Sequence, residues 1–132
     1  MDFDILFLDY KLKIFCAKEL DDSDLLNLTK LLINNSCKFI TYTKSVSEVS
    51  IIIEESYLKN FSDKVVVDPV DYNILQIYEN TSGCGHIGIV SHISNLFSQN
   101  SIPILYLNTF NNNYILYPSE LNYKIRTILN LT

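Results

Sequence analysis

The chain has 132 residues, of which 48% are hydrophobic and 19% are charged, a balance that provides a packed core and excludes a globally disordered chain. Its net charge of −5, with lysine and arginine scattered, argues against a protein whose main partner is nucleic acid. The three cysteines, Cys16, Cys37 and Cys84, are widely spaced and form no CxxC pair, which favours a reducing compartment. We find no signal-peptide pattern and no apolar stretch long enough to span a membrane. We therefore expect a cytoplasmic protein with no membrane insertion.

The first half of the chain is predicted to form strands around one helix. An apolar run predicts a short strand at residues 5–8, and Asp9 with Tyr10 predicts a bend. Alternating apolar residues predict a second strand at residues 11–18. Further apolar runs predict strands at residues 38–43 and 49–53 and a short helix at residues 54–61.

The predicted helix of this half begins after an acidic segment. Asp21, Asp22 and Ser23 are good N-cap residues, and Asn34 with Asn35 ends the helix. The acidic residues Asp21, Asp22 and Asp24 lack the spacing of an EF-hand calcium loop, so we interpret them as a helix cap. The apolar positions that fit a period of 3.6 residues are Leu25, Leu26, Leu28, Leu32 and Ile33.

The second half repeats the order of elements. Strands are predicted at residues 64–67, 72–78, 102–108 and 113–117, with helices at residues 86–99 and from Pro118 and Ser119 onward. The residues expected to face inward from these helices are Ile89, Ile93, Leu96, Phe97, Leu121, Ile125, Ile128 and Leu129. A strand–helix–strand–strand–helix order thus occurs twice, which is typical of ferredoxin-like folds.

We therefore expect an α+β protein made of two ferredoxin-like (βαββαβ) lobes packed together, with antiparallel sheets covered by helices on one face. The first lobe is predicted at residues 1–63 and the second at residues 64–132. The strand at residues 3–8 is a candidate for completing the sheet of the second lobe.

All three glycines lie between Gly83 and Gly88, in the predicted turn from a strand to a helix. Their spacing matches the Gly-x-Gly-x-x-Gly fingerprint of dinucleotide-binding folds. That fingerprint requires an acidic residue about 20 positions further on, and no Asp or Glu occurs between Glu79 and Glu120. The bare N–H groups at the start of the following helix suit an anion instead. This loop is the predicted small-molecule site.

Cys84 and His86 in the same loop allow two sharper interpretations. The first interpretation is that they supply two of the four ligands that a structural zinc needs, but no other Cys or His lies at a recognisable spacing. The second interpretation is a catalytic pair with Cys84 as nucleophile and His86 as base, but no third group that would orient the base is evident nearby. We therefore predict no metal site, no cofactor and no catalytic residue.

Residues 82–117 carry the most specific family resemblance. The features are a helix after Gly88, a β-rich run at residues 102–107, then Asn108-Thr109-Phe110, a hairpin at residues 111–113 and Tyr114-Ile115-Leu116. This segment resembles the second lobe of tandem ACT-domain proteins, which include the small bacterial amino-acid-binding ACT proteins and the CASTOR arginine sensors. Residues 5–17 and 37–53 are similar to the opening strands and the next hairpin of that family. The chain would correspond to one half of a CASTOR subunit.

The resemblance implies a non-catalytic, nutrient-sensing regulatory protein that binds a free amino acid at a lobe or dimer interface. It places the ligand between the loop before the helix and the hairpin at a strand end. The residues implied are Asn80, Thr81, Ser82, Gly83, Cys84 and Gly85 in the loop and Thr109, Phe110 and Asn113 in the hairpin.

Two departures from the family pattern bear on the ligand and the assembly. The family's hairpin Asp is Asn113 here, so the amino acid is not identified. The CASTOR site also uses a second tandem unit, which implies a homodimer or a protein partner. The alternative is a ligand-free interaction subunit of the same fold, which would pair through exposed sheet edges or an apolar helix face.

Overall fold

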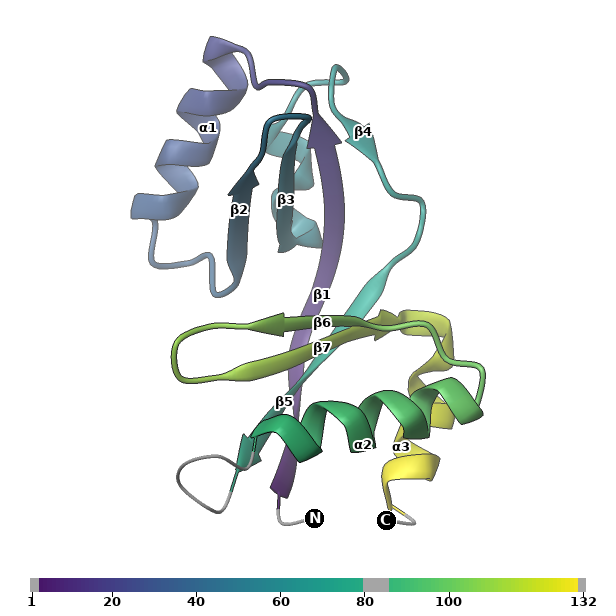
Figure 1. The fold of residues 1–132 in the computed structure, drawn as a ribbon. Helices are drawn as coiled ribbons and strands as arrows, with labels where there is room; N and C mark the ends of the chain where they lie inside the picture. The colour runs from purple at the N-terminus through teal and green to yellow at the C-terminus, as the bar shows by residue number, and fades with distance from the viewer. Residues whose placement is uncertain (1–2, 80–85, 131–132) are drawn as a thin grey trace. The chain divides into compact units, whose positions relative to one another are not determined.

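The computed structural model describes residues 3–79 and 86–130. The chain divides into two compact units (Figure 1). The central unit comprises Tyr10–Asp71, and the terminal unit comprises Met1–Asp9 and Tyr72–Thr132.

Strand β1, Phe3–Ala17, contributes its first residues to the terminal unit and its remaining residues to the central unit. The bend predicted at Asp9 and Tyr10 is wrong, because the strand continues through both residues. Asp9 is exposed, so a charged side chain is accommodated on an extended strand without burial. A polar residue pair in an apolar run therefore did not mark a turn here.

The central unit is an antiparallel sheet with one α-helix. Its strands lie in the order β2-β3-β1-β4, with Ile51 of β3 opposite both Tyr42 of β2 and Phe15 of β1. Phe15, Ile51 and Ile53 of the sheet pack with Leu28 of the helix in one core. The elements are α1 (Asp22–Ile33), β2 (Ile40–Lys44), β3 (Val49–Glu54), the 3₁₀ helix η1 (Glu55–Asn60) and β4 (Val66–Val67).

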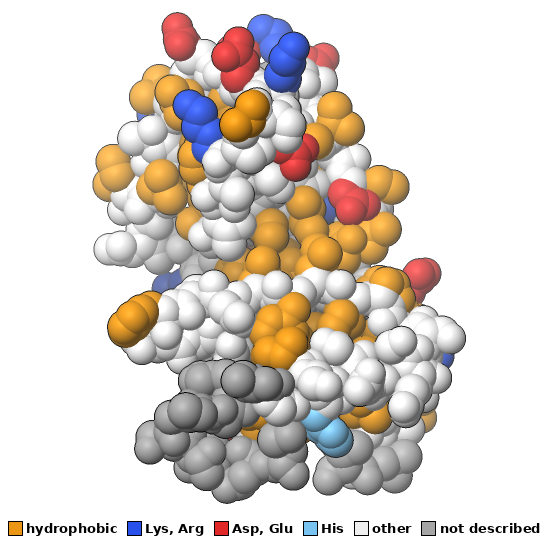
Figure 2. All heavy atoms as spheres, in the orientation of Figure 1, with side chains coloured by type: hydrophobic (Ala, Val, Ile, Leu, Met, Phe, Trp, Pro, Cys, Tyr) orange, Lys and Arg blue, Asp and Glu red, His pale blue; other side chains and the backbone are white. Residues whose placement is uncertain are grey.

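The predicted N-cap of α1 is confirmed, because the backbone N–H of Asp24 donates to Oδ1 of Asp21 across 2.8 Å. The buried face of the helix consists of Asp24, Leu28 and Leu31. The remaining periodic apolar residues are exposed, and Figure 2 shows hydrophobic side chains on the surface over this helix. These exposed residues are Leu25, Leu26, Leu32 and Ile33.

The terminal unit is also an antiparallel sheet, with strands in the order β1-β5-β7-β6. The short 3₁₀ helix η2 opens the closing helical segment, which was predicted from Pro118 and Ser119. The elements are β5 (Tyr72–Glu79), α2 (His86–Gln99), β6 (Leu105–Asn108), β7 (Asn113–Pro118), η2 (Ser119–Leu121) and α3 (Asn122–Asn130).

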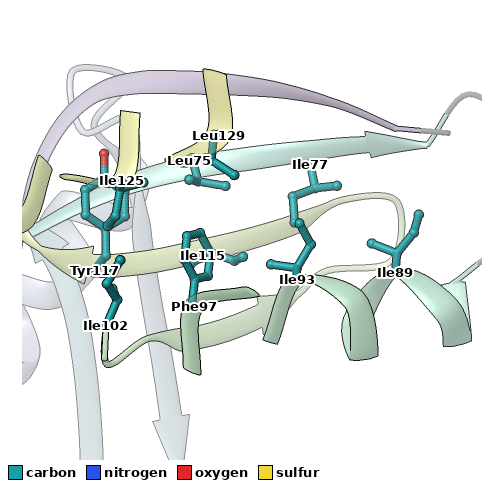
Figure 3. Packing of buried hydrophobic residues seen from close by; sticks show 10 residues of the cluster. All are labelled: Leu75, Ile77, Ile89, Ile93, Phe97, Ile102, Ile115, Tyr117, Ile125 and Leu129. Atoms are coloured by element: carbon teal, nitrogen blue, oxygen red, sulfur yellow. The ribbon is translucent and has the colours of Figure 1, made fainter. Parts of the chain in front are cut away.

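Both helices of the terminal unit pack on the face of the sheet that carries Leu75 and Ile77 of β5 and Ile115 of β7 (Figure 3). The predicted inward residues of α2 are confirmed: Ile89, Ile93 and Phe97 are buried and Leu96 is partly buried. On α3, Ile125 and Leu129 are buried.

The two units share one strand order. If the strands of each unit are numbered along the chain, both units have the strand order 2-3-1-4. For the terminal unit, this numbering counts β1 as the last strand. The chain is therefore an α+β protein built on antiparallel sheets.

Candidate functional site

The predicted site has two parts, and the structure describes one of them. The loop residues Asn80, Thr81, Ser82, Gly83, Cys84 and Gly85 lie outside the described residues. The elements on either side are described: β5 ends at Glu79 and α2 begins at His86. The strand and the helix predicted on either side of this segment are therefore confirmed.

Hydrogen bonds within the turn stabilise the hairpin between β6 and β7. Asn108 and Asn113 are opposite each other as the last pair of the two strands. The Thr109 N–H donates to the Asn112 carbonyl across 2.8 Å, and the Asn112 N–H donates to Thr109 Oγ1 across 3.1 Å. The Thr109 hydroxyl, predicted as a ligand contact, is thus used to close the turn.

A buried glutamine ties this turn to the neighbouring strand. Gln76 in β5 is 8% exposed, and its Nε2 donates to Oδ1 of Asn112 across 2.8 Å. A buried amide needs such a partner, because an unpaired polar group costs about 1–3 kcal/mol. Sequence reasoning missed Gln76; the available signal was one polar residue in the apolar run from Ile74 to Ile77.

The register of β5 and β7 places the end of β5 beside the hairpin. Ile77, two residues before the end of β5, is opposite Asn113, the first residue of β7. The chain therefore enters the predicted loop beside the hairpin. Asn113 is partly buried.

Phe110, the remaining hairpin residue of the predicted site, is fully exposed, with a relative accessibility of 101%. Because the Phe110 side chain is not buried in its own unit, it adds no hydrophobic stabilisation to that unit. The described geometry does not bring Phe110 together with Asn113 or with Gln76 in any hydrogen bond or ring contact.

No group of three or more His, Cys, Asp or Glu side chains that could hold a metal ion occurs within residues 3–79 and 86–130. Cys16 and Cys37 are free and partly buried. Burial raises the pKa of the Cys37 thiol, and the nearby Glu54 carboxylate raises it further. A thiol with a raised pKa is a poor nucleophile at neutral pH.

In the described part of the chain, no helix combines the length and the apolar character needed to cross a membrane.

The sequence matches no protein-family model, and no curated protein matches it. Solved structures are similar along nearly the whole chain. Protein Atu0741 from Agrobacterium tumefaciens has a TM-score of 0.73 at 18% identity, covering 98% of this chain and 88% of that one. The protein of unknown function VC0802 from Vibrio cholerae has a TM-score of 0.71 at 8% identity, with the same two coverages.

A third similar structure is that of a regulatory subunit. The regulatory subunit of aspartate kinase from Thermus thermophilus, in its ligand-free form, has a TM-score of 0.59 at 11% identity, covering 97% of this chain and 96% of that one. Identities this low establish the fold alone. The chain has an α+β fold similar to the ACT-type regulatory domains of aspartate kinases.

Proposed function

We propose that this chain is a non-catalytic regulatory protein that binds a free amino acid where β5 gives way to α2, against the β6–β7 hairpin. The observation that carries the proposal is the pairing of Ile77 with Asn113, which brings the end of β5 beside the hairpin. The fold shared with a regulatory subunit supports it. The proposed contacts are Asn80, Thr81, Ser82, Gly83, Cys84, Gly85, Thr109, Phe110 and Asn113.

The chemistry of the two parts suits the two ends of an amino acid. The first N–H groups of α2 have no partner within the helix and favour the ligand carboxylate. The hairpin from Asn108 to Asn113 contains four side-chain amides, those of Asn108, Asn111, Asn112 and Asn113, but no carboxylate. A cationic side chain would find no counter-charge there, so we propose a ligand with an uncharged side chain.

The two units are proposed to be the two ACT lobes. Each has the element order strand, helix, strand, strand, helical segment, strand, if the first residues of β1 supply the last strand of the terminal unit. The repeated strand order supports this assignment. It differs from a division at residue 63, because the first residues of β1 belong to the terminal unit and β4 belongs to the central unit. The site would be completed by a second copy or a partner subunit in the cytoplasm.

A thermal-shift screen with the twenty amino acids, on the full chain, tests the proposal. A ligand at about 100 times its Kd adds about 2.7 kcal/mol to the free energy of unfolding, which raises Tm by several degrees. We expect a shift with one or a few uncharged amino acids, reduced by Ser82→Ala. No shift with any amino acid at about 10 mM, a concentration that saturates sites of micromolar Kd, would reject the proposal.

A charge variant of the hairpin makes the screen specific. Asn113→Asp places a carboxylate in the proposed site and is expected to extend the shift to lysine or arginine. Asn111→Asp adds the same charge to the same hairpin at an exposed position and is the matched control. Equal responses of the two variants would place the ligand away from Asn113.

A second candidate function, an assembly subunit without a ligand, is favoured by the exposed face of α1. Leu25, Leu26, Leu32 and Ile33 are 46%, 55%, 58% and 76% exposed. They lie three and four positions on either side of Thr29, whose hydroxyl donates to the Leu25 carbonyl across 2.9 Å. An antiparallel pair of α1 helices would therefore match apolar residues with apolar residues, as a two-fold interface requires.

Light scattering on the same samples separates the two functions. The assembly subunit predicts a dimer that Leu26→Lys dissociates, with no amino-acid shift in Tm. Ser23→Lys, at an exposed position of α1 outside the apolar face, is the control. A monomer at every concentration would reject the α1 interface and leave the ligand screen unaffected.

A further inference from the structure

The terminal unit contains a cavity that none of the proposed amino-acid contacts line. It has a volume of about 490 Å³ and lies between the start of β1, the middle of α2 and the end of α3. Small-molecule sites have volumes of about 300–1,000 Å³, so this cavity has the size of a ligand site. The residues that line it are Phe3, Asp4, Ile5, Phe7, His92, Leu129 and Asn130.

The apolar wall comes from core-facing residues that the helices cover incompletely. Phe3, Ile5 and Phe7 alternate along β1 and pack against the core of the terminal unit, yet each remains only partly buried. By contrast, Leu75 and Ile77 on the adjacent strand β5 are 0% and 2% exposed. β1 is the edge strand of this sheet, so apolar area remains available there for the body of a ligand.

Two polar side chains face this wall from the two helices. His92 comes from α2, and its ring meets the Phe3 ring edge-on with 6.0 Å between centroids. Asn130 is the last residue of α3. Both side chains supply N–H donors. Asp4 also lines the cavity and is exposed, so its carboxylate stays in contact with solvent.

A cation lies beside the cavity. The guanidinium carbon of Arg126, one turn before Asn130 on α3, is 4.0 Å from the centroid of the Phe7 ring. Among the described residues, neither of the two ion pairs involves Arg126. A guanidinium that lies over a cavity wall, and that takes part in neither of these ion pairs within residues 3–79 and 86–130, favours an anionic group on the ligand.

We propose that this cavity binds a small aromatic carboxylate. The aromatic ring packs on Phe3, Ile5 and Phe7, and the carboxylate accepts hydrogen bonds from His92 and Asn130 in the field of Arg126. The inference uses none of the residues of the amino-acid site, so either can fail without the other.

Phenylacetate is the probe, titrated into the full chain while the His92 ring signals are followed by NMR. The chain has two histidines, so a His92→Gln variant assigns the signals. We expect saturable shifts of the His92 ring, and about tenfold weaker binding of the uncharged 2-phenylethanol, because a charge-assisted hydrogen bond contributes more than a neutral one. An unchanged His92 ring at about 10 mM phenylacetate, ten times a millimolar Kd, would overturn the proposal. Equal binding of the two probes would do the same.

Two variants test the polar groups. Asn130→Asp puts a like charge against the ligand carboxylate, and Arg126→Gln removes the cation; each is expected to weaken phenylacetate binding by about fivefold or more. Asn111→Asp, on the hairpin, adds the same charge elsewhere and is expected to leave binding unchanged. Thermal melts establish that each variant is folded. Unaltered binding in both cavity variants would overturn the assignment.

Discussion

Gln76 Nε2 donates a hydrogen bond to Asn112 Oδ1 across 2.8 Å, joining a buried position of β5 to the turn between β6 and β7. This bond fixes the hairpin against the strand from which the predicted loop leaves. It therefore orders the described half of the candidate site without needing a ligand.

Gln76→Leu is expected to destabilise the chain by about 1 kcal/mol, because it removes a buried hydrogen bond and leaves the Asn112 amide with one partner fewer. Urea denaturation measures the change. Asn112→Ala and the double variant complete a double-mutant cycle. If the two single effects simply add, the bond does not couple the strand to the turn.

Asp24 is 2% exposed, and its two carboxylate oxygens accept from the Ser62 N–H at 2.8 Å and from Ser62 Oγ at 2.6 Å. These bonds join α1 to the segment after η1. Asp24→Ala is expected to cost about 2–3 kcal/mol, because hydrogen bonds to a charged acceptor are the stronger kind and the Ser62 groups lose their partner. Asp22→Ala, at an exposed position in the same turn, is the control and should cost less.

The helix cap at Asp21 predicts a pH dependence. The Asp21 carboxylate accepts a hydrogen bond from the Asp24 N–H and lies 3.0 Å from the Lys64 ammonium. Both interactions lower the pKa of Asp21 below its ordinary value of 3.8, and the bond from Asp24 has the larger effect. The folded state therefore binds this proton less readily than the unfolded state. The stabilisation is present above pH 3.8 and is lost as the pH falls through the lowered pKa.

Asp21→Ala should accordingly be less stable than the parent chain at neutral pH, with the difference shrinking below about pH 4. Urea midpoints measured from pH 7 to pH 2 (roughly spanning the carboxylate range) give this difference directly. A difference that stays constant across the acid range would contradict the assigned cause.

Phe110 is fully exposed, so Phe110→Ser is expected to leave the free energy of unfolding within about 0.5 kcal/mol of the parent value. If Phe110 contacts the proposed amino acid or a second copy, the same variant weakens that binding. Thermal melts with and without the amino acid separate the two effects. A large loss of stability without ligand would show that Phe110 packs against the chain.

Several features of this protein were determined by local sequence patterns. Asp21 was a recognisable N-cap because its carboxylate can satisfy a free N–H of the first helical turn. Ile89, Ile93 and Phe97 recur at helical spacing, so the buried face of α2 followed directly. The hairpin at Asn113 and the change from strand β5 to helix α2 were likewise readable as changes in periodicity.

Only the tertiary structure decided which of two faces α1 buries. Apolar residues lie on both sides of this helix, and burial of Leu28 and Leu31 follows from the position of the sheet and from the bond between Asp24 and Ser62. Such long-range contacts have no local signature. The same holds for β1, which continues as a strand through Asp9 because it lies beside β5 in one unit and beside β3 and β4 in the other. It holds for Gln76 too, since its partner Asn112 is 36 residues away in the chain.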